Sequence, residues 1–125
     1  WDPSQHRYCG KVNMHLPDAW GVVVFGGRTP SDTESWRPSL DPSWTAQLGV
    51  MSIYYAQHFY RSTHTTFASD LAALHALVDT AALHDAQTDL RTSPDGSSFE
   101  VSVSFGGYTA TVTHRRFLRV TKQSE

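Results

Sequence analysis

The chain has one cysteine, Cys9, among 125 residues, so it cannot form an internal disulfide. Two interpretations of Cys9 stay open: a buried thiol, since free cysteine behaves as a small hydrophobe, or a thiol that pairs with another chain or segment. Long apolar runs are also absent. The longest, Val22 to Phe25, is far too short to cross a bilayer, so no membrane span is expected.

A broad basic surface is missing as well. The formal net charge is -2, and the Lys and Arg residues are scattered, apart from a cluster between His114 and Arg119. General nucleic-acid binding needs an extended positive surface, so nucleic acid is not an expected partner. Hydrophobic residues make up 39% and charged residues 18%, which indicates a folded globular domain rather than a disordered chain.

Catalytic and metal-binding motifs are likewise not found. The sequence holds no Gly-x-Ser-x-Gly elbow, no phosphate-binding glycine loop and no pair of carboxylates placed for glycoside hydrolysis. Of the seven histidines, His58, His64, His75 and His84 lie on or after expected helices, but no two form an i, i+4 pair with zinc-ligand spacing. We interpret them as surface residues, and expect no enzyme activity, metal or cofactor.

The most regular stretch is residues 41–62, which predicts one amphipathic helix. Its apolar side chains recur at steps of four and three and fall on one stripe: Trp44, Leu48, Met51, Tyr55 and Phe59. Asp41 is placed to cap the helix, and Pro42 suits its first turn. Ser69 or Asp70 can cap a second, short helix that ends near Ala82.

The C-terminal part predicts an antiparallel sheet. Residues 98–105 and 108–113 alternate apolar and polar side chains around Gly106-Gly107, a two-residue hairpin loop. Further strands are expected at 86–91 and 117–121. The hairpin register pairs Phe105 with Tyr108, Val103 with Ala110 and Val101 with Val112. This face, with Phe99, is expected to be buried against Leu48, Met51, Tyr55 and Phe59.

The N-terminal part predicts a two-stranded hairpin, which has too few neighbouring strands to cover its apolar side chains. Residues 10–15 and 20–25 read as two strands, followed by a Gly- and Pro-rich linker. Val22 to Phe25 is a continuous apolar run, typical of a strand covered on both faces. We therefore expect residues 8–25 to pair with strands of another chain or of a missing N-terminal segment, which predicts an oligomer.

Aromatic residues concentrate in the first third of the chain, where flat rings beside polar side chains suit stacking on sugar faces. Trp36 is the first candidate for carbohydrate binding, and Trp1 and Tyr8 are the others. Trp36 has a second interpretation, because a loop tryptophan commonly anchors its loop to the core. Trp20 and Trp44 are expected in the core.

Residues 1–25 resemble the closing segment of family 9-like carbohydrate-binding modules. A Trp-x-Pro stretch at Trp1 precedes Met14-His15, Pro17 and Trp20-Gly21, at the offsets found where that module enters its last strand. Residues 50–121 are similar to a helix-plus-sheet appendage that follows such modules in some secreted bacterial-type proteins, and loosely to pilin-like subunits. The resemblance implies an extracellular or cell-surface, carbohydrate-associated protein.

Together these features predict an α+β fold. Residues 1–27 would be closing strands that complete or imitate a β-sandwich, 28–40 a linker, and 41–125 a long helix and a short helix on a C-terminal antiparallel sheet. The leading functional hypothesis is non-enzymatic binding of a polysaccharide or glycan. The alternative is a structural subunit of an extracellular filament or complex assembled by strand addition.

Overall fold

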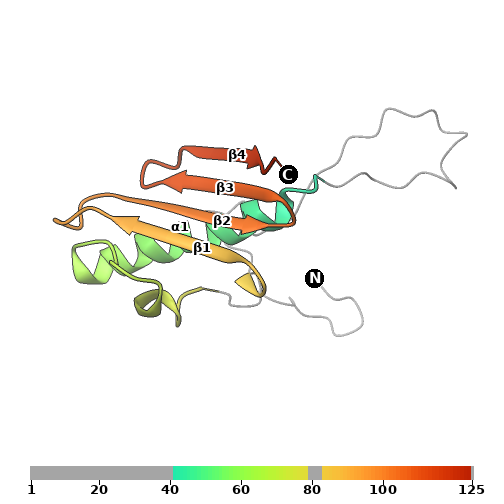
Figure 1. Ribbon diagram of the computed structural model, residues 1–125. Coiled ribbons are helices and arrows are strands. Elements are labelled where there is room, and N and C mark those ends of the chain that lie inside the picture. Colours follow the sequence, from blue (N-terminus) through green and yellow to red (C-terminus); the bar gives the residue numbers. More distant parts are fainter. Residues whose placement is uncertain (1–40, 79–82, 125) are drawn as a thin grey trace, which may run out of the picture. The chain divides into compact units, whose positions relative to one another are not determined.

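The computed structural model describes residues 41–78 and 83–124, and the predictions for residues 1–40 lie outside this part. One long helix, a short 3-10 helix and four strands follow in the order α1, η3, β1, β2, β3 and β4. Figure 1 shows α1 on one face of the sheet. The α+β class predicted from the sequence is confirmed.

Helix α1 spans Trp44–His64. Ser43 occupies the cap position with no side-chain capping bond. The Asp41 carboxylate instead accepts hydrogen bonds from the Ser43 backbone N–H at 2.9 Å and from its hydroxyl at 2.6 Å. Asp41 therefore holds the turn before the helix, and its prediction as the cap is wrong. The helix ends at Thr65, whose φ of 66° is left-handed and whose N–H donates to the carbonyl of Arg61.

The buried face of α1 differs from the predicted stripe. Small and branched side chains form it, together with Met51 and one amide: Ala46, Gly49, Val50, Met51, Ile53, Ala56 and Gln57. Of the predicted residues only Met51 is buried, while Trp44, Leu48 and Tyr55 are half-buried and Phe59 is 60% exposed. Small residues let a helix approach its neighbours closely, whereas the bulky aromatic rings lie along its margin.

In the described part of the segment after α1, the predicted second helix corresponds to a short 3-10 helix, and residues 79–82 lie outside the described part. Element η3 spans Ala72–Leu74, and the Asp70 carboxylate accepts a bond from the Ala73 N–H at 3.0 Å, as a capping residue does. Leu74 is fully buried. Gln57 binds the same segment, because its amide donates to the Ala68 carbonyl at 2.9 Å and accepts from the Ala68 N–H at 2.8 Å.

The four strands form an antiparallel meander in the order β1-β2-β3-β4. Their bounds are Gln87–Thr92, Phe99–Phe105, Tyr108–Thr113 and Leu118–Lys122. The predicted hairpin register is confirmed, with Phe105 opposite Tyr108 and Val101 opposite Val112. Gly106 and Gly107 have φ values of 59° and 80°, which glycine adopts with little strain.

The core lies between α1 and the centre of the sheet. Phe99, Val101, Val103, Ala110 and Val112 are all buried, as predicted. Phe105 was expected with them and is 36% exposed. It is the last residue before the hairpin loop, at the end of the sheet, so its side chain lies at the border of the core.

Candidate association surface

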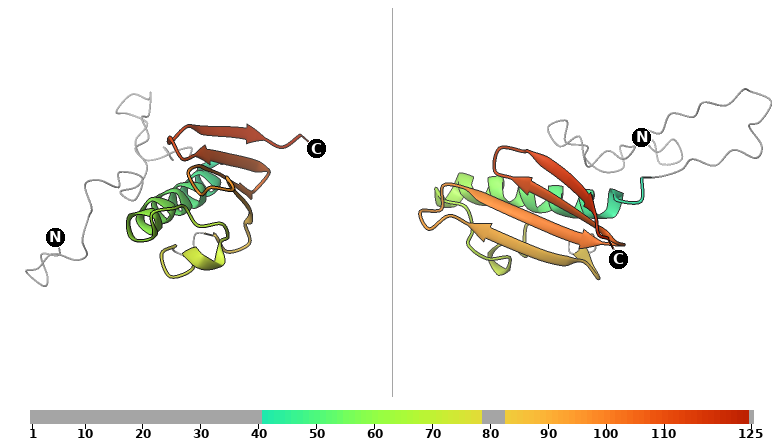
Figure 2. Two further views of the ribbon diagram at one scale, coloured as in Figure 1. Left: turned by 90° about the vertical axis from the view of Figure 1, so that its left-hand side faces the viewer. Right: turned by 45° about the horizontal axis from the view of Figure 1, so that its top comes forward.

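The residues predicted to bind sugar, Trp36, Trp1 and Tyr8, lie outside the described residues, as does the segment 8–25 predicted to pair with another chain. Within the described part, the clearest surface that lacks a covering element is at β4. Helix α1 packs on β2 and β3, and β4 lies beyond the margin of the helix (Figure 2). In residues 41–78 and 83–124, no further strand continues the sheet past β4.

The backbone of β4 presents hydrogen-bonding groups at this open edge. The Thr113 N–H donates to the Phe117 carbonyl at 3.2 Å, and the Gln123 N–H donates to the Gly107 carbonyl at 2.8 Å. These bonds, with the β3–β4 register, assign the odd-numbered residues of β4 to hydrogen-bonded pairs with β3. The N–H and C=O groups of Leu118, Val120 and Lys122 therefore point away from β3, toward the edge.

The same residues carry exposed apolar side chains. Leu118 and Val120 lie opposite Val112 and Ala110, on the face of the sheet that α1 covers further along. Each is nevertheless 38% exposed, whereas Val112 and Ala110 are fully buried. The difference arises because α1 does not extend over β4.

The margin of α1 faces this end of the molecule. The Arg116 guanidinium, in the turn before β4, lies 5.7 Å from the ring centre of Tyr55. Phe59 is one helical turn beyond Tyr55 on the same side of α1, and Phe117 follows Arg116. We call the exposed apolar residues of β4 and of the position before it the β4 margin: Phe117, Leu118 and Val120. Exposed apolar groups gathered in this way commonly mark an interaction site.

Positive charge concentrates at the same end. Positions 101–124 hold four of the ten Lys and Arg residues, namely Arg115, Arg116, Arg119 and Lys122, and no Asp or Glu. All four are exposed. Edge strands are often protected from aggregation by such charges, which also select the partner that can approach.

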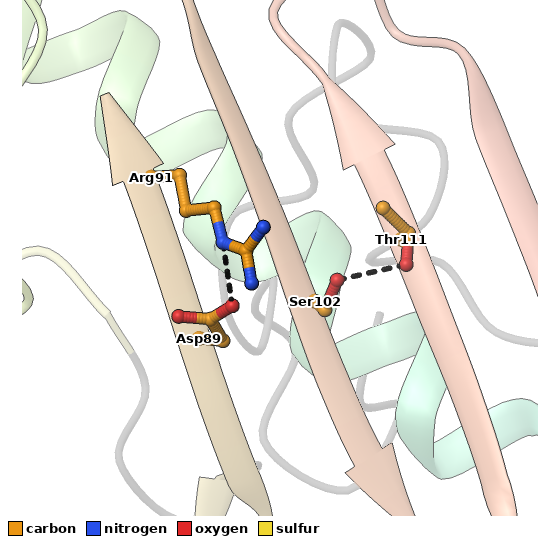
Figure 3. Close-up of polar contacts among 4 residues, drawn as sticks. All are labelled: Asp89, Arg91, Ser102 and Thr111. Carbon is orange, nitrogen blue, oxygen red and sulfur yellow. Dashed lines mark hydrogen bonds and ion pairs between the residues drawn. The ribbon is translucent and has the colours of Figure 1, made fainter. Parts of the chain in front are cut away.

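The opposite face of the sheet is polar. Ser102 and Thr111 are joined by a hydroxyl–hydroxyl bond of 2.8 Å, and Ser104 and Thr109 by another of 2.8 Å. On β1, the Arg91 guanidinium donates to the Asp89 carboxylate at 3.0 Å (Figure 3). These neighbouring side chains bond to one another across and along the strands, so the hydroxyl groups of this face are largely satisfied within the sheet.

A second candidate is the ring cluster around His58. Its imidazole lies 4.4 Å from the ring of Tyr54 and 5.3 Å from that of Phe67, and its Nε2 is 3.2 Å from the His114 carbonyl. Burial lowers the pKa of His58, nearby Arg61 and His114 lower it further, and the bond to the His114 carbonyl opposes the shift. The sequence interpretation of His58 as a surface residue is wrong, because the side chain is half-buried.

The surroundings of His58 are aromatic, which suits packing more than proton transfer. Next to the cluster, a hollow opens between the ends of β1, β2 and β3, lined in part by Phe99, His114 and Glu100.

The neighbouring turn holds Asp95, whose pKa falls to about 2 because the hydroxyls of Ser93 and Ser97 and the Ser97 N–H donate to its carboxylate. These bonds close the turn between β1 and β2.

Among residues 41–78 and 83–124, no three His, Cys, Asp or Glu side chains come together as a metal site would require. No described helix has the length and apolar character to cross a membrane.

No protein-family model, no curated protein and no solved structure matches this chain.

The open edge of β4 was missed by the sequence interpretation, although the strand itself was predicted. Two signals were available. The last strand of a meander lies at an edge unless another segment pairs with it. The cations around Phe117 and Leu118 are also typical of an edge strand.

Proposed function

We propose that this chain is a non-enzymatic binding protein of a cell surface or a secreted assembly, which joins other polypeptides by strand addition at β4. The observation that carries the proposal is the open edge of β4, where the outward backbone groups belong to residues, Leu118 and Val120, whose side chains are also exposed. Strand addition uses both: the backbone bonds give affinity, and the alternating side chains set the register.

The chemistry of β4 supports this activity. A strand added beside β4 would extend the sheet and accept or donate bonds at Leu118, Val120 and Lys122. Its side chains would cover apolar surface that is exposed in the single chain. Each Å² of apolar surface removed from water contributes roughly 25 cal/mol, so covering two aliphatic side chains makes a favourable but modest contribution to the free energy of binding.

The test is the amide exchange of β4 in the presence of a generic donor peptide that alternates Val and Gln. We expect the peptide to slow exchange at Leu118, Val120 and Lys122, and to leave Arg119 and Thr121 unchanged because they already bond to β3. The variant Val120→Pro removes an edge N–H that β3 does not use, so the fold should be retained and the protection lost. Val120→Thr keeps the N–H and serves as the matched control. Exchange rates at Leu118, Val120 and Lys122 that are the same with and without the peptide would refute strand addition.

A separate assembly prediction concerns the segment 8–25, whose two strands are expected to pair with strands of another chain or of a missing N-terminal segment. If the chain assembles in this way, light scattering should show particles that grow with protein concentration. A monomer at all concentrations, with protected amides from Val22 to Phe25, would contradict the assembly prediction.

Carbohydrate binding is a second proposed function, favoured by the aromatic residues of the first third and by the resemblance to family 9-like modules. Trp36, Trp1 and Tyr8 would stack on sugar rings, while β4 would hold the chain in an assembly. Replacing Trp36 with Ala should weaken retention on a glycan array without changing the melting temperature. Equal retention by the variant, or none by the wild type on any glycan, would remove this proposal.

A further inference from the structure

We infer that the strand received by β4 is acidic, with carboxylates alternating with aliphatic side chains. The inference rests on the proposed function, because it names the partner of the same edge. Any strand added beside β4 must share both faces of the sheet with it.

One face determines the aliphatic positions. Leu118 and Val120 lie on the face of the sheet that α1 covers further along, and each is exposed. Every second side chain of an added strand would fall on this face, beside Leu118 and Val120. Aliphatic side chains are required there, because a polar group would lose water without gaining a partner.

The other face determines the charged positions. Arg119 and Thr121 alternate with Leu118 and Val120, so they lie on the polar face with Ser102 and Thr111. The intervening side chains of an added strand would stand beside Arg119. A carboxylate at that position faces a cation in a region where residues 101–124 hold no acidic side chain.

The turn before β4 strengthens the preference for negative charge. Arg115 and Arg116 precede the strand, and Lys122 ends it, so cations stand at both ends of the edge. Arg119 lies on the face that would receive the carboxylates, and Lys122 lies at the end of the face that carries Leu118 and Val120. Exposed ion pairs contribute little singly, but several cations along one edge select strongly between acidic and basic partners.

A second copy of β4 fits this edge poorly. Antiparallel pairing of two β4 strands centred on Val120 would set Lys122 of one copy opposite Leu118 of the other. It would also place the Arg119 side chains of both copies diagonally across the polar face of the seam, where residues 101–124 hold no carboxylate to separate them. Like charges on adjacent strands are destabilising, so the cations act against edge-to-edge pairing of identical strands.

The experiment compares three peptides of equal length on the 125-residue chain. They alternate Val with Glu, Val with Gln or Val with Lys, and binding is measured by fluorescence anisotropy at low and high salt. We expect the Glu peptide to bind about tenfold more tightly than the Lys peptide at low salt, with the Gln peptide between them. Salt should reduce this difference, because it screens exposed charges.

Two variants locate the effect. Arg119→Glu should reduce the preference for the Glu peptide over the Lys peptide, and Arg61→Glu, on α1, is the matched charge change outside β4 and should leave the preference unchanged. Val120→Pro should abolish binding of all three peptides. A melting curve for each variant verifies that the fold is retained.

The outcomes separate this inference from the function on which it rests. Equal binding of the three peptides would overturn the acidic partner and leave strand addition intact. No binding of any peptide would overturn both. Vesicles containing phosphatidylserine provide the remaining arm: if they bind the chain more tightly than the Glu peptide, and Val120→Pro does not change this, the β4 margin is a membrane-facing surface and the inference is wrong.

Discussion

The centre of the sheet and its β4 edge follow the same sequence pattern but differ in how far their apolar side chains are buried. In β2 and β3, apolar residues alternate with Ser and Thr, and Val103 and Val112 are fully buried. In β4, Leu118 and Val120 alternate with Arg and Thr in the same way, yet both remain exposed. The difference comes from α1, which covers β2 and β3 and not β4.

Alternation therefore predicts a strand and its two faces, but not the burial of either face. Burial depends on an element from elsewhere in the chain or from another chain. For β4 that element is the strand we propose, and the contrast between Val103 and Val120 can be tested by equal changes at both positions.

The largest effect is expected from a charge at the centre of the sheet. Val103→Asp would bury an unpaired carboxylate, which costs several kcal/mol against a typical total of about 5–15 kcal/mol, so the variant should be largely unfolded at 25 °C. Val120→Asp should cost below about 1 kcal/mol, because the side chain stays in water. Urea titrations of both variants measure the difference. Similar losses at the two positions would show that β4 is as well covered as β2.

A smaller effect is expected at Gln57, whose amide is fully buried. Gln57→Leu removes the partner of both the N–H and the carbonyl of Ala68, although the Ala68 carbonyl keeps its bond from the Thr92 hydroxyl at 2.8 Å. A buried N–H without a partner costs about 1–3 kcal/mol. Leu48→Gln, on the half-buried margin of α1, is the comparison and should cost less. A neutral Gln57→Leu would mean that water replaces the amide.

The smallest effect concerns pH. The lowered pKa of His58 means that the folded chain holds its proton less tightly than the unfolded chain does. The unfolded state therefore binds more protons below about pH 6.5, so stability should fall as pH drops from 7.5 to 5. Asp41 and Asp95, whose pKa values are also lowered, affect stability only below about pH 4.

The control for that pH dependence is His58→Phe, which keeps an aromatic ring beside Tyr54 and Phe67. Melting temperatures at pH 5 and 7.5 should differ less for this variant than for the wild type. The same slope in both proteins would assign the pH dependence to another group.

Much of the described fold could be read from local chemistry. Gly106 and Gly107 fix the β2–β3 register because both adopt positive φ, and the four strands were placed within one or two residues. The rotation of α1 about its own axis, which decides which of its side chains face the sheet, could not be predicted in the same way. A spacing of three and four marks both the aromatic stripe through Tyr55 and Phe59 and the buried face through Val50 and Ile53, and only the shape of the facing sheet decides between them.

The proposed binding residues also differ in whether the sequence alone can predict them. Trp36, Trp1 and Tyr8 follow from composition and from the resemblance, and they stay predictions because they lie outside the described residues. The edge at β4 follows from topology, which depends on contacts between distant parts of the chain. Cations around an apolar strand indicate an open edge only once the strand is known to be last in the sheet.

The hydroxyl pairs on the polar face limit the dimensionality of any assembly this domain builds. Stacking two sheets face to face requires apolar side chains that interdigitate at about 10 Å. The face carrying Ser102–Thr111 and Ser104–Thr109 offers bonded hydroxyls instead, and α1 occupies the other face. If strand addition occurs as proposed, growth would be confined to the direction in which strands succeed one another, which would give a ribbon one sheet thick and disfavour layered stacking of sheets.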